Sequence, residues 1–170
     1  MIKESFWKDK KVLITGHTGF KGSWLSLILL NLGCEVFGLS LEPYNEPNLF
    51  DSLNIKKEIG HNIVDIRNKK EVLSLVKKIN PDSIFHLAAQ PLVREGYNSP
   101  VYTWETNLNG TINVLESLRL IKKKCSAVIV TTDKVYREND SIYGYRENDY
   151  LGGYDPYSCS KSAVELAVDS

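Results

Sequence analysis

The chain lacks any hydrophobic run long enough to cross a bilayer, because its longest apolar stretch covers only residues 25–32. It also lacks an excess of charge of either sign, since 21 Lys and Arg residues balance 21 Asp and Glu residues. No global field therefore favours nucleic acid or an anionic membrane surface. Residues 1–11 are polar and charged, without the apolar core of a signal peptide. From these absences we expect a cytoplasmic protein that binds neither nucleic acid nor a membrane.

Cysteine is scarce as well. Cys34, Cys125 and Cys159 are widely separated and odd in number, and no pair has the spacing of metal ligands. We interpret them as small buried thiols in a reducing compartment, and we expect no metal site.

The pattern of apolar residues predicts strands that alternate with helices. A length of 170 residues, with 42% hydrophobic and 25% charged, suits one domain spanning the chain. Alternating elements predict an α/β fold of the Rossmann type, a doubly wound parallel sheet covered on both faces. We expect strands at 12–15, 36–41, 63–66, 84–88 and 127–131, and helices at 23–32, 69–79, 101–121 and from residue 156 onward.

A glycine-spaced loop follows the first expected strand directly. Gly16, Gly19 and Gly22 stand three residues apart, a spacing typical of the short-chain dehydrogenase class. Gly16 permits a sharp turn, Gly19 lets the backbone approach a pyrophosphate, and Gly22 allows the next helix to pack closely on the sheet. The helix N-terminus would then offer N–H groups and its positive dipole end to the phosphates. The alternative is a tight turn that binds no ligand.

A tyrosine and a lysine stand four residues apart at the start of the last expected helix. Residues i and i+4 share a helix face, so Lys161 lies beside Tyr157. A phenol is a poor base at neutral pH, but a neighbouring cation favours the phenolate, which can take a hydroxyl proton while hydride leaves the same carbon. On most helices a tyrosine and a lysine at this spacing simply lie on the face exposed to solvent and have no catalytic role. Its place after a fifth strand, in a chain with a dinucleotide loop, favours catalysis.

Polar residues follow the fifth expected strand, at the edge where open α/β sheets keep their chemistry. A threonine hydroxyl there, from Thr131 or Thr132, can hold a substrate hydroxyl, and Asp133 and Lys134 add two titratable groups. An enzyme that expels water needs an acid and a base, whereas a simple dehydrogenase does not. The alternative is a surface Asp-Lys turn without a catalytic role.

Four segments resemble the CDP-glucose 4,6-dehydratases, a family of extended short-chain dehydrogenases that act on nucleotide-sugars. They are residues 12–25, 86–94, 144–148 and 152–157, and the likeness runs from about residue 11 to the end of the chain. The glycine loop with His17, Phe20 and Lys21 is more specific than the general pattern of the class. Asp133-Lys134 also favours this family, because the related dTDP-glucose dehydratases typically have Asp-Glu there.

The resemblance implies a dehydration of CDP-glucose. Hydride leaves C4 for NAD while Tyr157 takes the O4 proton; water is then lost across C5 and C6, and hydride returns to C6. The product would be CDP-4-dehydro-6-deoxy-D-glucose, a precursor of deoxysugars in surface lipopolysaccharide. Thr132 would position the substrate, Asp133 would protonate the leaving hydroxyl, and Lys134 would remove the C5 proton after losing its own. The division of labour between Asp133 and Lys134 stays open.

The resemblance also implies which residues contact the ligands. Those implied to bind the cofactor NAD are Gly16, Thr18, Gly19, Phe20, Lys21, Gly22, Asp65, Ile66, Leu87, Ala88, Ala89, Asn107, Thr131, Tyr157 and Lys161. Those implied to bind the CDP-glucose substrate are Gln90, Arg94 and Thr132. The residues alone leave NAD and NADP open, because no aspartate ends the second expected strand and Lys21 could meet a 2′-phosphate.

Members of this family are much longer than the present chain. We therefore expect an N-terminal fragment that stops before the C-terminal substrate domain and is inactive alone, and a full-length protein that forms a homodimer or a larger homo-oligomer. Two other functions stay open. One is another sugar-nucleotide 4,6-dehydratase or a 4-epimerase, and the other is a non-catalytic module that binds a nicotinamide nucleotide.

Overall fold

The computed structural model describes residues 4–138 and 142–170. The chain divides into two compact units, Met1–Ala88 with Asn113–Val130 and Ala89–Ile112 with Thr131–Ser170. The expectation of one dinucleotide-binding domain over the whole chain stays a prediction. Among the described residues, no helix is both long enough and apolar enough to pass through a bilayer.

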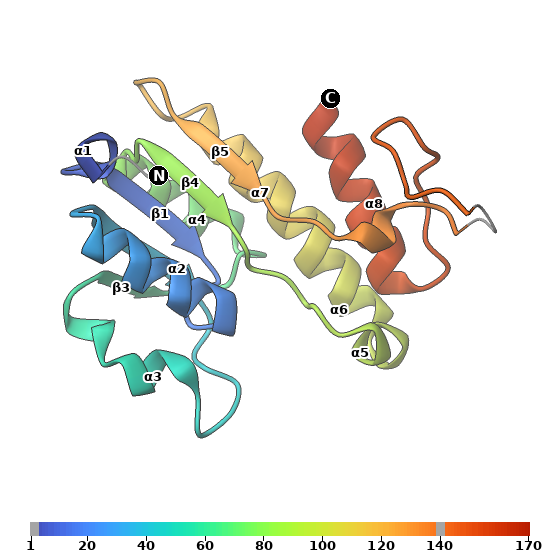
Figure 1. Cartoon of the computed structure of the whole chain (residues 1–170), viewed down its shortest axis with the longest axis horizontal. Helices are drawn as coiled ribbons and strands as arrows, with labels where there is room; N and C mark the ends of the chain where they lie inside the picture. Colours follow the sequence, from blue (N-terminus) through green and yellow to red (C-terminus); the bar gives the residue numbers. More distant parts are fainter. Residues whose placement is uncertain (1–3, 139–141) are drawn as a thin grey trace. The chain divides into compact units, whose positions relative to one another are not determined.

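The first unit contains a five-stranded sheet in the order β3-β2-β1-β4-β5, with every neighbouring pair parallel (Figure 1). The chain runs outward from the central strand to one edge, returns, and builds the other half of the sheet. This order confirms the expected Rossmann-type fold. The strands are β1 (Lys11–Thr15), β2 (Glu35–Ser40), β3 (Gly60–Ile63), β4 (Ser83–His86) and β5 (Ser126–Ile129).

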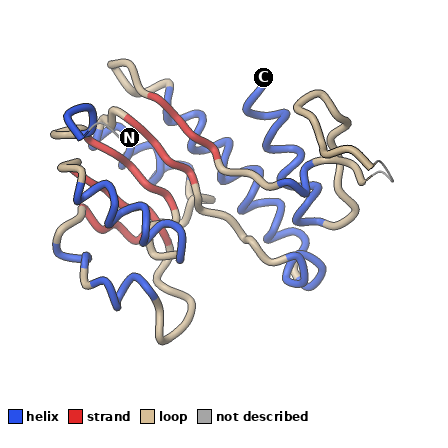
Figure 2. The backbone as a smooth tube through the Cα atoms, in the orientation of Figure 1, coloured by secondary structure: helices blue, strands red, loops and turns tan. Residues whose placement is uncertain are grey.

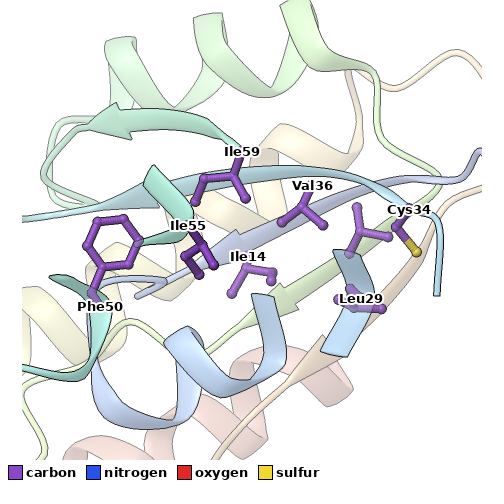
Figure 3. Close-up of a cluster of buried hydrophobic side chains, with 8 residues drawn as sticks. Ile14, Leu29, Cys34, Val36, Phe50, Ile55 and Ile59 are labelled. Atoms are coloured by element: carbon purple, nitrogen blue, oxygen red, sulfur yellow. The ribbon is translucent and has the colours of Figure 1, made fainter. Parts of the chain in front are cut away.

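Helices cover both faces of this sheet (Figure 2). Successive side chains of β1 point to opposite faces, and each face packs against helices in its own hydrophobic cluster. Val12 and Ile14 belong to the first cluster, with residues from α2 (Phe20–Asn31) and α3 (Leu49–Leu53). Figure 3 shows Ile14 in this cluster with Leu29 of α2 and Phe50 of α3. Leu13 points into the second cluster, with residues from α4 (Lys69–Ile79) and α7 (Gly110–Leu118). The short N-terminal helix α1 (Glu4–Trp7) adds Trp7 to the edge of the first cluster.

Four strands end before the positions expected from hydrophobicity, and β2 does so by one residue, at Ser40. β3 covers Gly60–Ile63 rather than 63–66, because Gly60 pairs with Phe37 of β2 and the backbone there continues the ladder through His61 and Asn62. A Cβ at Gly60 would lie 2.4 Å from the Phe37 ring, so the strand begins at a residue without a side chain. β4 and β5 end at His86 and Ile129 instead of 88 and 131. The polar and small residues expected to end strands therefore lie in the loops that follow them.

The helices agree with expectation at α4 and at the start of α8, and differ elsewhere. α4 has the expected bounds and ends where Asn80 adopts a left-handed conformation at φ 50°. α2 begins three residues earlier than expected, at Phe20, directly after the glycine loop. α3 and the 3-10 turn Ile55–Lys57 occupy a segment for which no element was expected.

The second unit is helical and is built around α8 (Pro156–Asp169). α5 (Val93–Asn98), α6 (Pro100–Trp104), a π-helical segment (Glu105–Asn109) and a 3-10 turn (Asp133–Val135) all pack against it. The helix expected at 101–121 is therefore interrupted: it begins at Pro100, passes through the π segment, and ends with α7 at Leu118. π segments inside helices often occur at functional sites.

Candidate functional site

The first glycine of the loop has the geometry that the sequence predicts. Gly16 has φ 77°, a left-handed conformation, and it lies where the carboxyl ends of β1 and β4 are adjacent. A Cβ on Gly16 would lie 2.8 Å from the backbone nitrogen of Ala88. Both the conformation and the close approach require glycine at this turn.

Gly22 is required for a different contact from the expected one. A Cβ there would lie 2.0 Å from the carbonyl oxygen of Gly16 and 2.8 Å from Cα of His17. The first turn of α2 therefore packs on the backbone of the glycine loop itself, rather than on the sheet. Ser23 reinforces this contact by donating to the carbonyl of His17 at 3.1 Å.

The N-terminus of α2 has features that favour a nearby anion. Its N-cap is Gly19, no side chain caps the first-turn N–H groups, and no acidic residue stands in that turn. Gly19, Phe20 and Lys21 are exposed. Uncapped N–H groups and the positive end of a helix dipole fit a pyrophosphate, and the cation of Lys21 adds to that field. These residues fit the dinucleotide that the sequence implies.

Thr18 fastens the glycine loop to the end of β2. The Thr18 hydroxyl is buried, lies 2.7 Å from the Ser40 hydroxyl, and donates to the carbonyl oxygen of Leu41 at 2.8 Å. The Thr18 hydroxyl is thus engaged in hydrogen bonds within the protein. Glu42, the first carboxylate after β2, is exposed. The structure leaves the expected choice between NAD and NADP open.

Two histidines lie beneath the loop, a pairing that the sequence analysis did not identify. His17 is fully buried, and its Nε2 lies 2.7 Å from Nδ1 of His61 on β3. Gly38 makes room for the imidazole, because a Cβ on Gly38 would lie 2.2 Å from the His17 ring. Burial and the charge of His61 lower the pKa of His17 from 6.5 to about 4. Burial, followed by the charge of Lys56, also lowers the pKa of His61.

These histidines predict that the protein loses stability in mild acid. A histidine with a lowered pKa in the folded state takes up fewer protons than in the unfolded chain, so its contribution is present above pH 6.5 and is lost as the pH falls toward 4. The shift of His17 corresponds to about 3 kcal/mol of unfolding free energy over that range. Urea unfolding of the chain at pH 7, 6, 5 and 4 measures it.

His17→Gln separates this effect from the titration of carboxylates. The amide keeps a hydrogen-bonding group toward His61 but carries no ionisable proton. The variant is expected to be less stable at pH 7, and its unfolding free energy should fall less steeply between pH 6.5 and 4. Parallel pH profiles for the two proteins would contradict the assignment to His17.

The implied adenine contacts lie after β3, not at its end as expected. The Asp65 carboxylate accepts from the Arg67 guanidinium, with Nη2 at 2.6 Å from Oδ2. Hydrogen bonds from Arg67 lower the pKa of Asp65 below its ordinary value. Ile66 is buried in the second hydrophobic cluster. Asp65 is thus fixed in place by Arg67, and its contact with adenine stays a prediction.

Leu87, Ala88 and Ala89 likewise follow β4 and do not end it. All three are half-buried. The N–H of Ala88 donates to Oγ1 of Thr15 at 3.1 Å, and Thr15 is in turn 2.6 Å from Nδ1 of His86. These bonds hold the backbone after β4 close to Gly16, and the implied approach of a cofactor to this main chain stays a prediction.

In the second unit, α8 carries the tyrosine and the lysine. The Asp155 carboxylate caps the helix by accepting from the N–H of Ser158 at 3.0 Å and from its hydroxyl at 2.5 Å. Tyr157 is half-buried in the first turn, and Lys161 follows one turn later with a side chain that is 4% exposed. Burial lowers the pKa of Lys161 to about 8, and the charge of Glu165 opposes that shift. The spacing expected for a phenol and a neighbouring cation is therefore realised on one helix face.

The residues after β5 form a short turn, residues 131–135, named the acid–base turn after the roles that the sequence predicts for Asp133 and Lys134. The Thr131 hydroxyl donates to Oε1 of Glu165, and the Thr132 hydroxyl donates to the Asp133 carboxylate at 3.1 Å. Asp133 and Lys134 are exposed on the 3-10 turn. Glu165 could not be predicted as a site residue, because nothing in its local spacing distinguishes it from a solvated helix carboxylate.

The side-chain amides of Asn107 and Gln90 form hydrogen bonds within the second unit. Asn107, buried in the π segment, accepts from the N–H of Gln90 at 2.8 Å and donates to the Ser160 hydroxyl at 2.9 Å. The Gln90 side chain donates to the Thr103 hydroxyl at 2.9 Å and accepts from the N–H of Leu92 at 2.6 Å. Asn107 therefore joins the segment after β4 to the helix that carries Tyr157, while Arg94 stands exposed on α5. Their implied ligand contacts stay predictions.

Side chains that ligate metals are scattered in the part of the chain that the structure describes. No group of three or more His, Cys, Asp or Glu side chains there is arranged to hold a metal ion. The three cysteines are free thiols, with Cys34 buried and the other two half-buried, so the expectation that all three are buried is correct for Cys34 alone.

The sheet order, the glycine loop and the Tyr157–Lys161 pair define a chain of the extended short-chain dehydrogenase class. Comparison with known proteins narrows the class. The family model described as GDP-mannose 4,6 dehydratase matches residues 13–170, and the chain belongs to this family.

Several known proteins are similar to this chain. CDP-glucose 4,6-dehydratase of Salmonella typhimurium is 42% identical over all of this chain and 47% of its own length. CDP-paratose 2-epimerase of Salmonella typhi is 34% identical over 91% of this chain and 51% of its own length. The structure of Thermus thermophilus UDP-glucose 4-epimerase in complex with NAD superposes with a TM-score of 0.80 at 30% identity, covering 94% of this chain and 50% of that one. The chain thus spans about half the length of the relatives it matches.

Proposed function

We propose that the full-length protein dehydrates CDP-glucose to CDP-4-dehydro-6-deoxy-D-glucose with NAD as its resident cofactor. The observation that carries the proposal is the acid–base turn, in which Asp133 and Lys134 stand together in the same unit as Tyr157 and Lys161. The 42% identity to a CDP-glucose 4,6-dehydratase supports the choice of sugar nucleotide. The proposal places the reaction in deoxysugar synthesis for surface polysaccharide in the cytoplasm.

In the proposed mechanism the glycine loop and the N-terminus of α2 bind the pyrophosphate, and Gly16 and Gly22 permit the close backbone contacts that shape the loop. When bound, the nicotinamide supplies a hydride acceptor for C4 and later a hydride donor for C6. Similarity to an epimerase solved in complex with NAD supports this cofactor over NADP. Asn107, through its bonds to Gln90 and Ser160, orients the backbone after β4 and the helix α8.

Tyr157 starts the reaction by taking the proton from the C4 hydroxyl. The buried ammonium of Lys161 stabilises the phenolate that this step requires. The Thr132 hydroxyl holds the substrate hydroxyl in line with the phenolic oxygen. A C4 ketone then acidifies the C5 hydrogen, so that Lys134, once deprotonated, removes it as a general base.

Asp133 completes the elimination by protonating the C6 hydroxyl, which leaves as water. Hydroxide is a poor leaving group, and general-acid assistance is worth about 10²–10⁴-fold in rate. Epimerisation at C4 has no need of this group, which favours a dehydratase over the 4-epimerase alternative. We also propose that the full-length protein is a homodimer or a larger homo-oligomer.

The mass of the product tests the proposal. The full-length protein, incubated with CDP-glucose, is expected to release a nucleotide-sugar lighter by one water, as measured by mass spectrometry. Parallel incubations of cofactor-stripped protein with NAD and with NADP should restore activity with NAD alone. A product of unchanged mass but altered configuration would establish an epimerase instead, and an unaltered substrate would support a binding module.

A further inference from the structure

Glu165 lies where it can act on two parts of the proposed machinery at once. It follows Lys161 by four residues on α8 and Tyr157 by eight, so the three side chains occupy neighbouring positions on one helix face. It is half-buried, and its Oε1 accepts the hydroxyl proton of Thr131. Thr131 is the first residue of the acid–base turn, and the bond spans 34 residues of sequence.

A second hydrogen bond fixes the other end of the same turn. The Ser162 hydroxyl, on α8, donates to the carbonyl oxygen of Val135 at 2.7 Å. The N–H of Gly152 donates to the same carbonyl at 2.8 Å. Residues 131–135 are therefore hydrogen-bonded to α8 at both ends, by Glu165 at Thr131 and by Ser162 at Val135. Of these two α8 residues, Glu165 is the charged one.

That charge bears on the buried lysine. Burial disfavours the ammonium form of Lys161, and the Glu165 carboxylate favours it, which leaves a pKa of about 8. The elements packed on α8 carry further ionisable groups, namely Arg94, Glu95, Tyr97, Tyr102, Glu105, Asp133 and Lys134. Among the described residues, Glu165, one turn away on the same helix, is the one whose charge opposes the lowering of the Lys161 pKa by burial. It also acts on Tyr136, together with Glu147 and Asp149.

We propose that Glu165 is a positioning residue of the reaction: its carboxylate holds Thr131, and with it the acid–base turn, against α8, one helical turn from Lys161. From that position its negative charge favours the ammonium form of Lys161. The inference rests on the proposed function, because it assigns roles through Lys161 and the turn. It adds a carboxylate that links the group activating Tyr157 to the groups that expel water. One side chain thereby serves both the oxidation and the elimination.

The test separates the charge from the hydrogen bond. Glu165→Gln keeps an oxygen that can accept from Thr131 but removes the negative charge, whereas Glu165→Asp keeps the charge on a shorter side chain. Glu147→Gln is the matched control, since it makes the same change at a carboxylate that acts on Tyr136 and not on Lys161. The titration of Lys161 is followed by ¹³C NMR of lysine-labelled full-length protein, with the signal assigned through Lys161→Arg.

The midpoint of Lys161 is expected to fall by about one pH unit in Glu165→Gln, because a neighbouring anion has been lost. It should return most of the way in Glu165→Asp and stay in place in Glu147→Gln. An unchanged midpoint in Glu165→Gln, or an equal shift in Glu147→Gln, would overturn the charge role. Thermal melts of the folded variants ensure that a shift is not read from unfolded protein.

Activity supplies the second readout. In the full-length enzyme, the pH profile of kcat for Glu165→Gln is expected to move in the same direction as the NMR midpoint, with kcat about fivefold lower at pH 8 and recovered near pH 6, and KM little changed. A profile that stays in place while the midpoint moves would overturn the link to the reaction. If the wild-type protein leaves CDP-glucose unaltered, the proposed function fails, and the NMR titration still decides the role of Glu165.

Discussion

Tyr157→Phe in the full-length protein is expected to stop the oxidation of CDP-glucose at C4. The change removes only the phenolic oxygen, and the half-buried ring keeps its place in the first turn of α8. Without that oxygen the C4 hydroxyl has no base beside the buried Lys161. Loss of a general base typically costs about 10²–10⁴-fold in rate. The keto sugar, lighter than substrate by two hydrogens, should be missing from acid-quenched single-turnover mixtures analysed by mass spectrometry.

A matched change elsewhere guards against a general loss of structure. Tyr150 is exposed in the loop before α8, so Tyr150→Phe removes a phenol without touching the proposed site. That variant should oxidise the sugar at the wild-type rate. Keto sugar formed at a normal rate by Tyr157→Phe would show that another group takes the C4 proton, and the assignment of Tyr157 would be wrong.

The fold was largely predictable, because its signals are local. The β-branched run before Gly16 predicts a strand, and the helical period of the apolar residues in 69–79 predicts a helix. Both signals lie within the element that they predict, and β1 and α4 are present where expected. The position of β3 could not be predicted, because it depends on Phe37 of the neighbouring strand β2. The Phe37 ring lies where a side chain at residue 60 would stand, so its partner in β3 is Gly60. Hydrophobicity favoured the apolar residues that follow, which enter the core after the strand has ended.

The candidate site was predictable in its motifs but not in its internal bonds. Gly16 shows the left-handed turn that its place after a strand implies. The pairing of His17 with His61 joins residues 44 apart, and that of Thr131 with Glu165 joins residues 34 apart. In neither pair does the separation along the sequence indicate that the two residues are in contact. The π segment around Asn107 is likewise set by packing on α8, while its residues look like any helix.

Asp133→Asn in the full-length enzyme is expected to separate oxidation from elimination. Asp133 is exposed on the 3-10 turn, where its carboxylate accepts from the Thr132 hydroxyl at 3.1 Å, and the asparagine oxygen can accept the same bond. The amide cannot donate a proton to the C6 hydroxyl. The C4 keto sugar should therefore form and accumulate, while loss of water slows by about 10²–10⁴-fold. Mass spectrometry of quenched mixtures distinguishes the two species.

Deuterium exchange at C5 then separates the acid from the base. In Asp133→Asn, solvent deuterium should still enter C5 of the accumulated keto sugar, because Lys134 remains to remove that proton. In Lys134→Met the exchange should fall together with dehydration, since the thioether has no basic nitrogen. Asp169→Asn, at the exposed end of α8, serves as the control and should dehydrate CDP-glucose normally. Dehydration at the wild-type rate by Asp133→Asn would remove the assigned acid, and with it the residue-level reason to favour a dehydratase over an epimerase.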